Sequence, residues 1–192
     1  MTFDPAKVPG GDVVAWGAQC RAKALAGLHA GDWRPVYDWT KSWIGWGGGA
    51  WLPDTWLLYA ASAILHGQPR TAVHSLDLGI GTWLAGDSDR ALLTWCRGTI
   101  VMDRLTDPKT ALIDFEDCDG AIPAWLRTQA DTRLEDCRVA APRSRKRTPS
   151  VKPRPPFTGF DQMLHVVAPP VGQRRDGEQP EAWAELEKYF MA

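Results

Sequence analysis

Six of the eleven tryptophans in this 192-residue chain lie in one short stretch, residues 33–56. Three of the six recur at i, i+4 and i+7, which is the spacing of one stripe of an α-helix. They are Trp39, Trp43 and Trp46. Glycines at 47–49 end that helix and Pro53 begins the next. The stretch therefore predicts two helices that meet at an aromatic corner, and the rest of the chain has to pack around it.

Helix boundary signals recur along residues 12–139. Side chains that suit N-caps precede several of the expected helices, because their oxygens can accept hydrogen bonds from the free N–H groups of a first turn. They are Asp12, Asp32, Asp87 or Ser88, and Asp107. Gly31 and Gly67 suit the left-handed conformation that follows a helix. The expected helices span residues 12–30, 32–46, 53–66, 69–85, 87–102, 108–119 and 123–139. No β-hairpin signal interrupts them, and their short connections predict an all-α stack of antiparallel helix hairpins.

Two glycines, Gly79 and Gly81, fall inside the expected helix 69–85. Each weakens a helix by about 1 kcal/mol relative to alanine. Close approach of a neighbouring helix would explain both.

The composition changes after the helical region, and the change divides the chain. Residues 1–11 form an irregular leader, residues 12–139 a helical domain, residues 140–156 a basic, proline-rich linker, and residues 157–192 a C-terminal docking segment. The linker has too little hydrophobic content to fold, so we expect it to be flexible. Its basic residues are Arg143, Arg145, Lys146, Arg147, Lys152 and Arg154. They can contact a polyanion such as nucleic acid in a salt-sensitive way, pair with the acidic stretch 103–119, or keep a tether solvated.

The C-terminal segment ends in an amphipathic helix that begins near Pro180. Four large apolar residues recur at i, i+3, i+6 and i+7. They are Trp183, Leu186, Tyr189 and Phe190. Such a face needs a surface to cover. We expect residues 173–192 to dock into a groove, either the chain's own or that of a partner.

The helix hairpins resemble tetratricopeptide (TPR) repeats over residues 16–104. One window carries Ala24 and the turn at residues 31–33, and a second carries Trp56, Ala60, Gly67 and Ala72. A third carries Leu78–Gly79, Gly86–Asp87 and Ala91. The family's 34-residue period is met once, between Gly31 and Gly67, and broken once, between Gly67 and Gly86. The resemblance implies a concave surface for a peptide or protein partner.

The sequence shows no recognisable catalytic or metal-binding motif. The cysteines at 20, 96, 118 and 137 form no CxxC pair, and the acidic stretch 114–119 fails the EF-hand template. We therefore expect that stretch to be a solvated helix end. No cofactor is predicted, and with no signal peptide or membrane span we expect a cytoplasmic chain with reduced thiols.

These observations favour a non-catalytic protein-interaction module that binds a protein partner or self-associates. We expect Trp39, Trp43 and Trp56 to be core, and Trp46 and Trp51, beside the glycines, to contact a partner together with the face of the last helix. Two alternatives remain open. One is a nucleic-acid-associated accessory protein that uses the basic linker. The other is an enzyme or small-ligand receptor with a tryptophan-lined pocket near residues 47–51.

Overall fold

The computed structural model describes residues 12–82, 85–141 and 173–191. These ranges contain eight α-helices, two short 3-10 helices and no strand, which confirms the all-α prediction. The α-helices are α1 (Val13–His29), α2 (Trp33–Trp46), α3 (Pro53–Leu65), α4 (Pro69–Ile80), α5 (Asp87–Asp103), α6 (Pro108–Cys118), α7 (Arg127–Ala140) and α8 (Trp183–Phe190). The 3-10 helices are η2 (Gly49–Trp51) and η3 (Asp119–Ala121).

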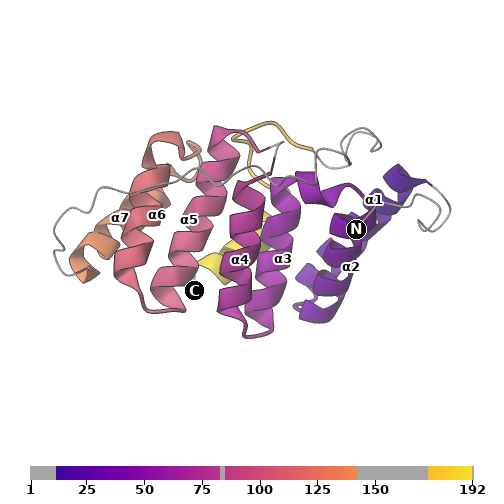
Figure 1. Cartoon of the computed structure of the whole chain (residues 1–192), viewed down its shortest axis with the longest axis horizontal. Helices are drawn as coiled ribbons and strands as arrows, with labels where there is room; N and C mark the ends of the chain where they lie inside the picture. The colour runs from indigo at the N-terminus through magenta and orange to yellow at the C-terminus, as the bar shows by residue number, and fades with distance from the viewer. Residues whose placement is uncertain (1–11, 83–84, 142–172, 192) are drawn as a thin grey trace.

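Helices α1 to α7 follow one another in chain order along the long axis of the molecule (Figure 1). Each helix packs on the next, so that α1 with α2, α3 with α4 and α5 with α6 form helix hairpins, and α7 follows as an unpaired helix. Helix α8 lies behind α4 in this view and packs on α3, α1 and α5, which are first helices of the hairpins. The hairpins therefore form a row whose first helices all contact α8.

The helix ends are set by local chemistry that the sequence makes visible. The Asp12 carboxylate accepts hydrogen bonds from the backbone of Val14 and Ala15, at 2.9 and 3.0 Å, at the start of α1. Gly31 has a φ of 68°, and Asp32 then caps α2 through the Arg34 backbone at 3.1 Å. These predicted boundaries are confirmed.

For the second hairpin, the predicted turn is confirmed and the predicted end of its second helix is wrong. Gly67 has a φ of 73° between α3 and α4, as expected. Helix α4, however, ends at Ile80 instead of continuing to residue 85, and residues 83–84 lie outside the described ranges. Gly81 is its C-cap residue and has no close neighbour from another helix, so close packing does not explain it.

Gly79 does mark a close approach between helices. A Cβ atom at this position would lie 2.7 Å from Cβ of Trp56 on α3. No side chain fits there, so glycine allows α3 and α4 to pack at this distance. The expectation is confirmed for Gly79 alone.

The third hairpin turns at Thr106, between α5 and α6, where a non-glycine residue takes a φ of 52°. Asp107 caps α6 through the Thr110 backbone at 3.1 Å, as the Asp107–Pro108 pair predicts. Gly86 instead connects α4 to α5 and so joins two hairpins. The turns within hairpins therefore lie near residues 31, 67 and 106.

The aromatic corner between α2 and α3 is filled by packing. Trp43 is 1% exposed, and a Cβ atom on Gly49 would lie 2.7 Å from its ring. The Trp56 indole N–H donates to the Ala50 carbonyl at 3.0 Å, which satisfies a buried donor. Trp39 is half-buried against Trp16, with ring centroids 5.8 Å apart. Trp43 and Trp56 are buried in the core, and Trp39 packs at its edge.

Candidate functional site

Residues 173–191, here called the tail segment, lie against one side of the helix row. The surface that they contact, here called the groove, belongs to α1, α3, α5 and the first turn of α7 with Trp125 before it. The tail segment contacts this groove in three successive zones: an acidic pair, the N-terminus of α5, and an aromatic wall. Each zone is built from residues far apart in the sequence.

The acidic pair consists of Asp54 in the first turn of α3 and Asp89 in the first turn of α5. The Arg174 guanidinium lies between them. Its Nε donates to Asp54 at 2.8 Å, and its Nη1 pairs with Asp89. The Asp89 side chain is 5% exposed and that of Arg174 is 12% exposed. One cation from the tail segment therefore compensates two carboxylates of the groove, of which Asp89 is buried and Asp54 partly buried.

Burial raises the pKa of both carboxyl groups of the acidic pair. For Asp89 the pKa rises to about 6, because desolvation outweighs the attraction of Arg174 and the charges of Asp54 and Asp176 add to it. The pKa of Asp54 also rises through burial, although Arg174 and Arg21 oppose the shift. The groove therefore strongly favours a guanidinium in this zone.

The second zone is the N-terminus of α5. The Asp176 carboxylate accepts hydrogen bonds from the backbone of Ser88 at 3.3 Å and of Asp89 at 2.8 Å. A negative charge is favourable there, because free N–H groups and the helix dipole meet it. Gly86 leaves room for this carboxylate, and a Cβ atom at Gly86 would collide with it.

The sequence predicted Asp87 or Ser88 as the N-cap of α5, and that prediction is wrong. Asp87 is already the first helical residue, and Gly86 at the cap position supplies no side-chain hydrogen bond. The capping carboxylate comes from Asp176 in the tail segment. A capping partner 87 residues away from Asp89 leaves no local pattern in the sequence.

The third zone is an aromatic wall that holds α8. Trp183, Leu186 and Phe190 are at most 2% exposed. The Trp183 ring lies 6.3 Å from that of Trp95 and 5.1 Å, edge to face, from that of Trp125. Just before α8 the Trp125 indole N–H donates to the Gly177 carbonyl at 2.9 Å. This zone buries the apolar face of α8 and orients the turn that leads into it.

Polar pairs flank α8 on two sides. On the side of α1, Arg21 pairs with Glu181, and the His29 ring lies 3.1 Å from the Glu185 carboxylate. On the side of α7, the Gln129 amide donates to Glu187 at 2.6 Å. These contacts are partly exposed, so they add little to stability. Their main effect is to set the position of α8.

The residues that the sequence singled out for partner binding fall in two places. Trp183, Leu186 and Phe190 are buried in the chain's own groove, and Tyr189 beside them is half-buried. At the aromatic corner Trp46 is half-buried and Trp51 is 6% exposed. Both side chains are therefore at least half-buried, and the partner contact and the tryptophan-lined pocket near residues 47–51 stay predictions.

One further sequence expectation, that of a solvated helix end at residues 114–119, has a definite outcome. Asp114 is buried and holds Arg97 through two hydrogen bonds, at 2.7 and 3.1 Å, so it is not part of a solvated helix end. Within residues 12–82, 85–141 and 173–191, no group of acids, histidines and cysteines could hold a metal ion. The basic residues Arg143, Arg145, Lys146, Arg147, Lys152 and Arg154 lie outside the described ranges.

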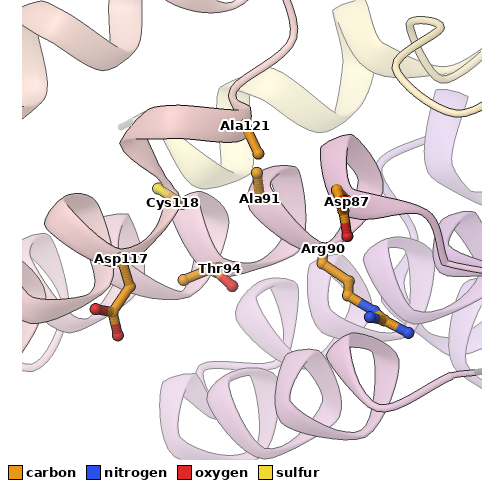
Figure 2. A pocket seen from close by; sticks show the side chains of 7 residues that line it. All are labelled: Asp87, Arg90, Ala91, Thr94, Asp117, Cys118 and Ala121. Atoms are coloured by element: carbon orange, nitrogen blue, oxygen red, sulfur yellow. The ribbon is translucent and has the colours of Figure 1, made fainter. Parts of the chain in front are cut away.

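A shallow cavity of about 250 Å³ lies between α5 and the end of α6. Figure 2 shows Ala91 and Ala121 facing each other across it, with Arg90 and Asp117 at opposite ends. Its one thiol, Cys118, is a poor nucleophile, because burial raises its pKa to about 12 and its sulfur faces the Phe115 carbonyl at 3.5 Å. The cavity therefore offers no activated group for chemistry.

No family model, curated protein or solved structure matches the chain. In the part of the chain that the structure describes, none of the helices has the length and apolar character that crossing a membrane requires.

Proposed function

We propose that the chain is a non-catalytic adaptor that binds a protein or peptide partner through its row of helix hairpins. The observation that carries this proposal is the docking of residues 173–191 on α1, α3 and α5. A continuous segment is bound there by charge, by a helix N-terminus and by apolar anchors. Recognition of an amphipathic helix in a groove uses these same contacts.

The chemistry of the buried polar groups supports binding over catalysis. Asp54 and Asp89 are held by Arg174, and Asp114 is held by Arg97. Burial raises the pKa of the thiols of Cys20, Cys96, Cys118 and Cys137, so they stay protonated near neutral pH. Groups committed in this way serve structure and recognition, because a catalytic base or nucleophile needs a free, tuned side chain.

The TPR-like resemblance fits the same proposal. The turns within hairpins near residues 31, 67 and 106 give three helix pairs, and α8 lies against the first helices of those pairs. A concave surface for a peptide or protein partner is what the resemblance implies.

The test is cross-linking of the tagged full chain in the cells that produce it naturally, followed by identification of the cross-linked sites. We expect a discrete protein partner, recovered equally after nuclease treatment, with cross-links on α1, α3, α5 or α7. Recovery of nucleic acid alone, lost as the salt concentration rises, would instead favour the accessory-protein alternative. Recovery of no macromolecule would contradict the proposal.

A further inference from the structure

The groove presents three kinds of recognition chemistry to one segment of chain. Asp54 and Asp89 are two carboxylates that one guanidinium neutralises. The N-terminus of α5 accepts a carboxylate beside Gly86. Trp95 and Trp125 form an apolar wall with one indole N–H aimed at a backbone carbonyl. These zones follow one another in an order that a single linear segment can satisfy.

The tail segment satisfies that order with a short pattern. It reads Arg174, then Asp176–Gly177, with Gly177 at a φ of 79°, and then a helix with Trp183, Leu186 and Phe190 at i, i+3 and i+7. Helix α8 has eight residues, and a helix of that length is not stable alone in water. Its structure therefore depends on the groove, as in a segment that folds on binding.

The contacts of the tail segment do not require its covalent connection to α7. The hydrogen bonds and ion pairs that join it to the groove run between residues 174–187 and side chains or backbone of α1, α3, α5 and α7. The stretch that joins Ala141 to Gln173 lies outside the described ranges. A separate segment with the same side chains would meet the same partners.

We propose that the groove binds a segment of a partner protein with the pattern of the tail segment, and that residues 173–191 compete with it in cis. The partner segment carries an arginine, an Asp-Gly turn two residues later, and an amphipathic helix with Trp, Leu and Phe on one face. This inference rests on the proposed adaptor function and names the chemistry of its partner.

A partner protein is favoured over a second copy of the chain by simple arithmetic. A tethered segment has an effective concentration on the order of millimolar. An identical tail from a second copy at micromolar concentration would lose that competition, since its contacts are the same. A segment that displaces residues 173–191 must bind more tightly, and therefore differs from them in sequence outside the shared pattern.

The test uses the full chain and a fluorescent peptide of residues 173–191 as the probe, read by anisotropy. In the chain, Trp183→Ala removes the buried anchor of the tail segment and leaves the groove unchanged. We expect this variant to bind the peptide about 100-fold more tightly than the wild-type chain does, because loss of a buried tryptophan weakens the cis competitor at least that much. A peptide with Arg174→Ala should bind at least 10-fold more weakly than the wild-type peptide.

Two milder variants disrupt the contact between the Asp176 carboxylate and the N-terminus of α5, one from the tail segment and one from the groove. Asp176→Ala weakens only the tail segment of the chain, so the wild-type peptide should bind about five-fold more tightly. Gly86→Ala obstructs the same contact from the groove, so it weakens the cis tail and the added peptide equally. The apparent affinity of the Gly86→Ala chain should therefore stay near that of the wild type. General destabilisation of the fold would change both variants in the same direction.

Three results would overturn the inference. The first is no binding of the peptide to either Trp183→Ala or Asp176→Ala, which would make the tail segment an inseparable part of the core. The second is equal gains for Asp176→Ala and Gly86→Ala. The third is a concentration-dependent dimer of the wild-type chain in light scattering, abolished by Trp183→Ala, which would assign the groove to a second copy. A partner cross-linked outside the groove would still support the adaptor function.

Discussion

Arg174 joins the tail segment to two helices of the row at once, α3 and α5. Its guanidinium meets Asp54 and Asp89, which lie in the first turns of α3 and α5, where acids are favourable for the helix dipole alone. That ordinary role explains why the sequence did not identify the two acids as a site. Arg174 lies in a polar loop, and its partner Asp54 is 120 residues away in the sequence. Only the folded chain brings the three together.

Replacing Arg174 by methionine should destabilise the chain by about 3–5 kcal/mol, because the buried Asp89 and the partly buried Asp54 both lose this counter-charge. Urea unfolding followed by circular dichroism measures the free energy of unfolding. Adding Asp89→Asn should recover part of the loss. Arg138→Met is the control, since Arg138 pairs only loosely with Glu135 on the surface of α7, and we expect a change below about 0.5 kcal/mol. Equal effects for Arg174 and Arg138 would contradict this account of the acidic pair.

The raised pKa of Asp89 predicts a pH dependence of stability with a definite sign. Its pKa is about 6 in the folded chain and about 4 in an unfolded one. The folded state therefore binds the proton more tightly, so the contribution of Asp89 to stability falls as the pH rises from about 4 to about 6. The change is on the order of 3 kcal/mol.

Urea unfolding of the wild-type chain and of Asp89→Asn, at several pH values between 4 and 7, measures that contribution. The slope of stability against pH should be shallower in the variant. It should not vanish, because burial also raises the pKa of Asp54, Asp103 and Asp114. Identical slopes in the two proteins would contradict the assignment to Asp89.

At the scale of helices, most boundaries were predictable because their causes are local. Asp12, Asp32 and Asp107 cap helices through backbone groups two or three residues away. Gly31 and Gly67 adopt the left-handed conformation that their position in the sequence indicated. A pattern within one turn of a helix is enough to reveal such features.

The boundaries that sequence reasoning missed have distant or unusual causes. The cap of α5 comes from Asp176, and the third hairpin turns at Thr106, where no glycine indicates a positive φ. Because no local signal marks that turn, the sequence instead suggests Gly86 as the turn within a hairpin. It also predicts a helix over residues 69–85 that is too long. The order of the helices was clear, but their pairing near α4 and α5 was not.

The close approach of α3 and α4 gives a test at this scale. Gly79→Ala should destabilise the chain by about 1–3 kcal/mol through overpacking against Trp56, despite the better helix propensity of alanine. Gly45→Ala in α2 is the matched control, because a Cβ atom there meets nothing within 4 Å. We expect it to be neutral or to stabilise by up to about 1 kcal/mol. Thermal and urea unfolding of both variants distinguish these outcomes, and a stabilising Gly79→Ala would contradict the packing argument.

For the whole molecule, the sequence predicts an amphipathic C-terminal helix that needs a surface to cover. That surface could belong to the same chain or to a partner. An apolar stripe shows that a helix must be covered, without showing by what. The structure covers α8 with α1, α3 and α5 of the same chain. The groove could not be predicted from the sequence. Its acidic pair and its aromatic wall come from separate helices, and only the packing of the hairpins brings these helices to the same side of the molecule.

The central claim is that the tail segment is a bound ligand of the helix row and can leave it while the row stays folded. Hydrogen exchange of the wild-type full chain, followed by mass spectrometry, measures this directly. We expect the amides of Trp183–Phe190 to exchange through local opening, with a free energy at least about 2 kcal/mol below that of the amides in the middle of α5. Equal protection of α8 and α5, with exchange only through global unfolding, would show that the tail segment belongs to the core and would contradict the claim.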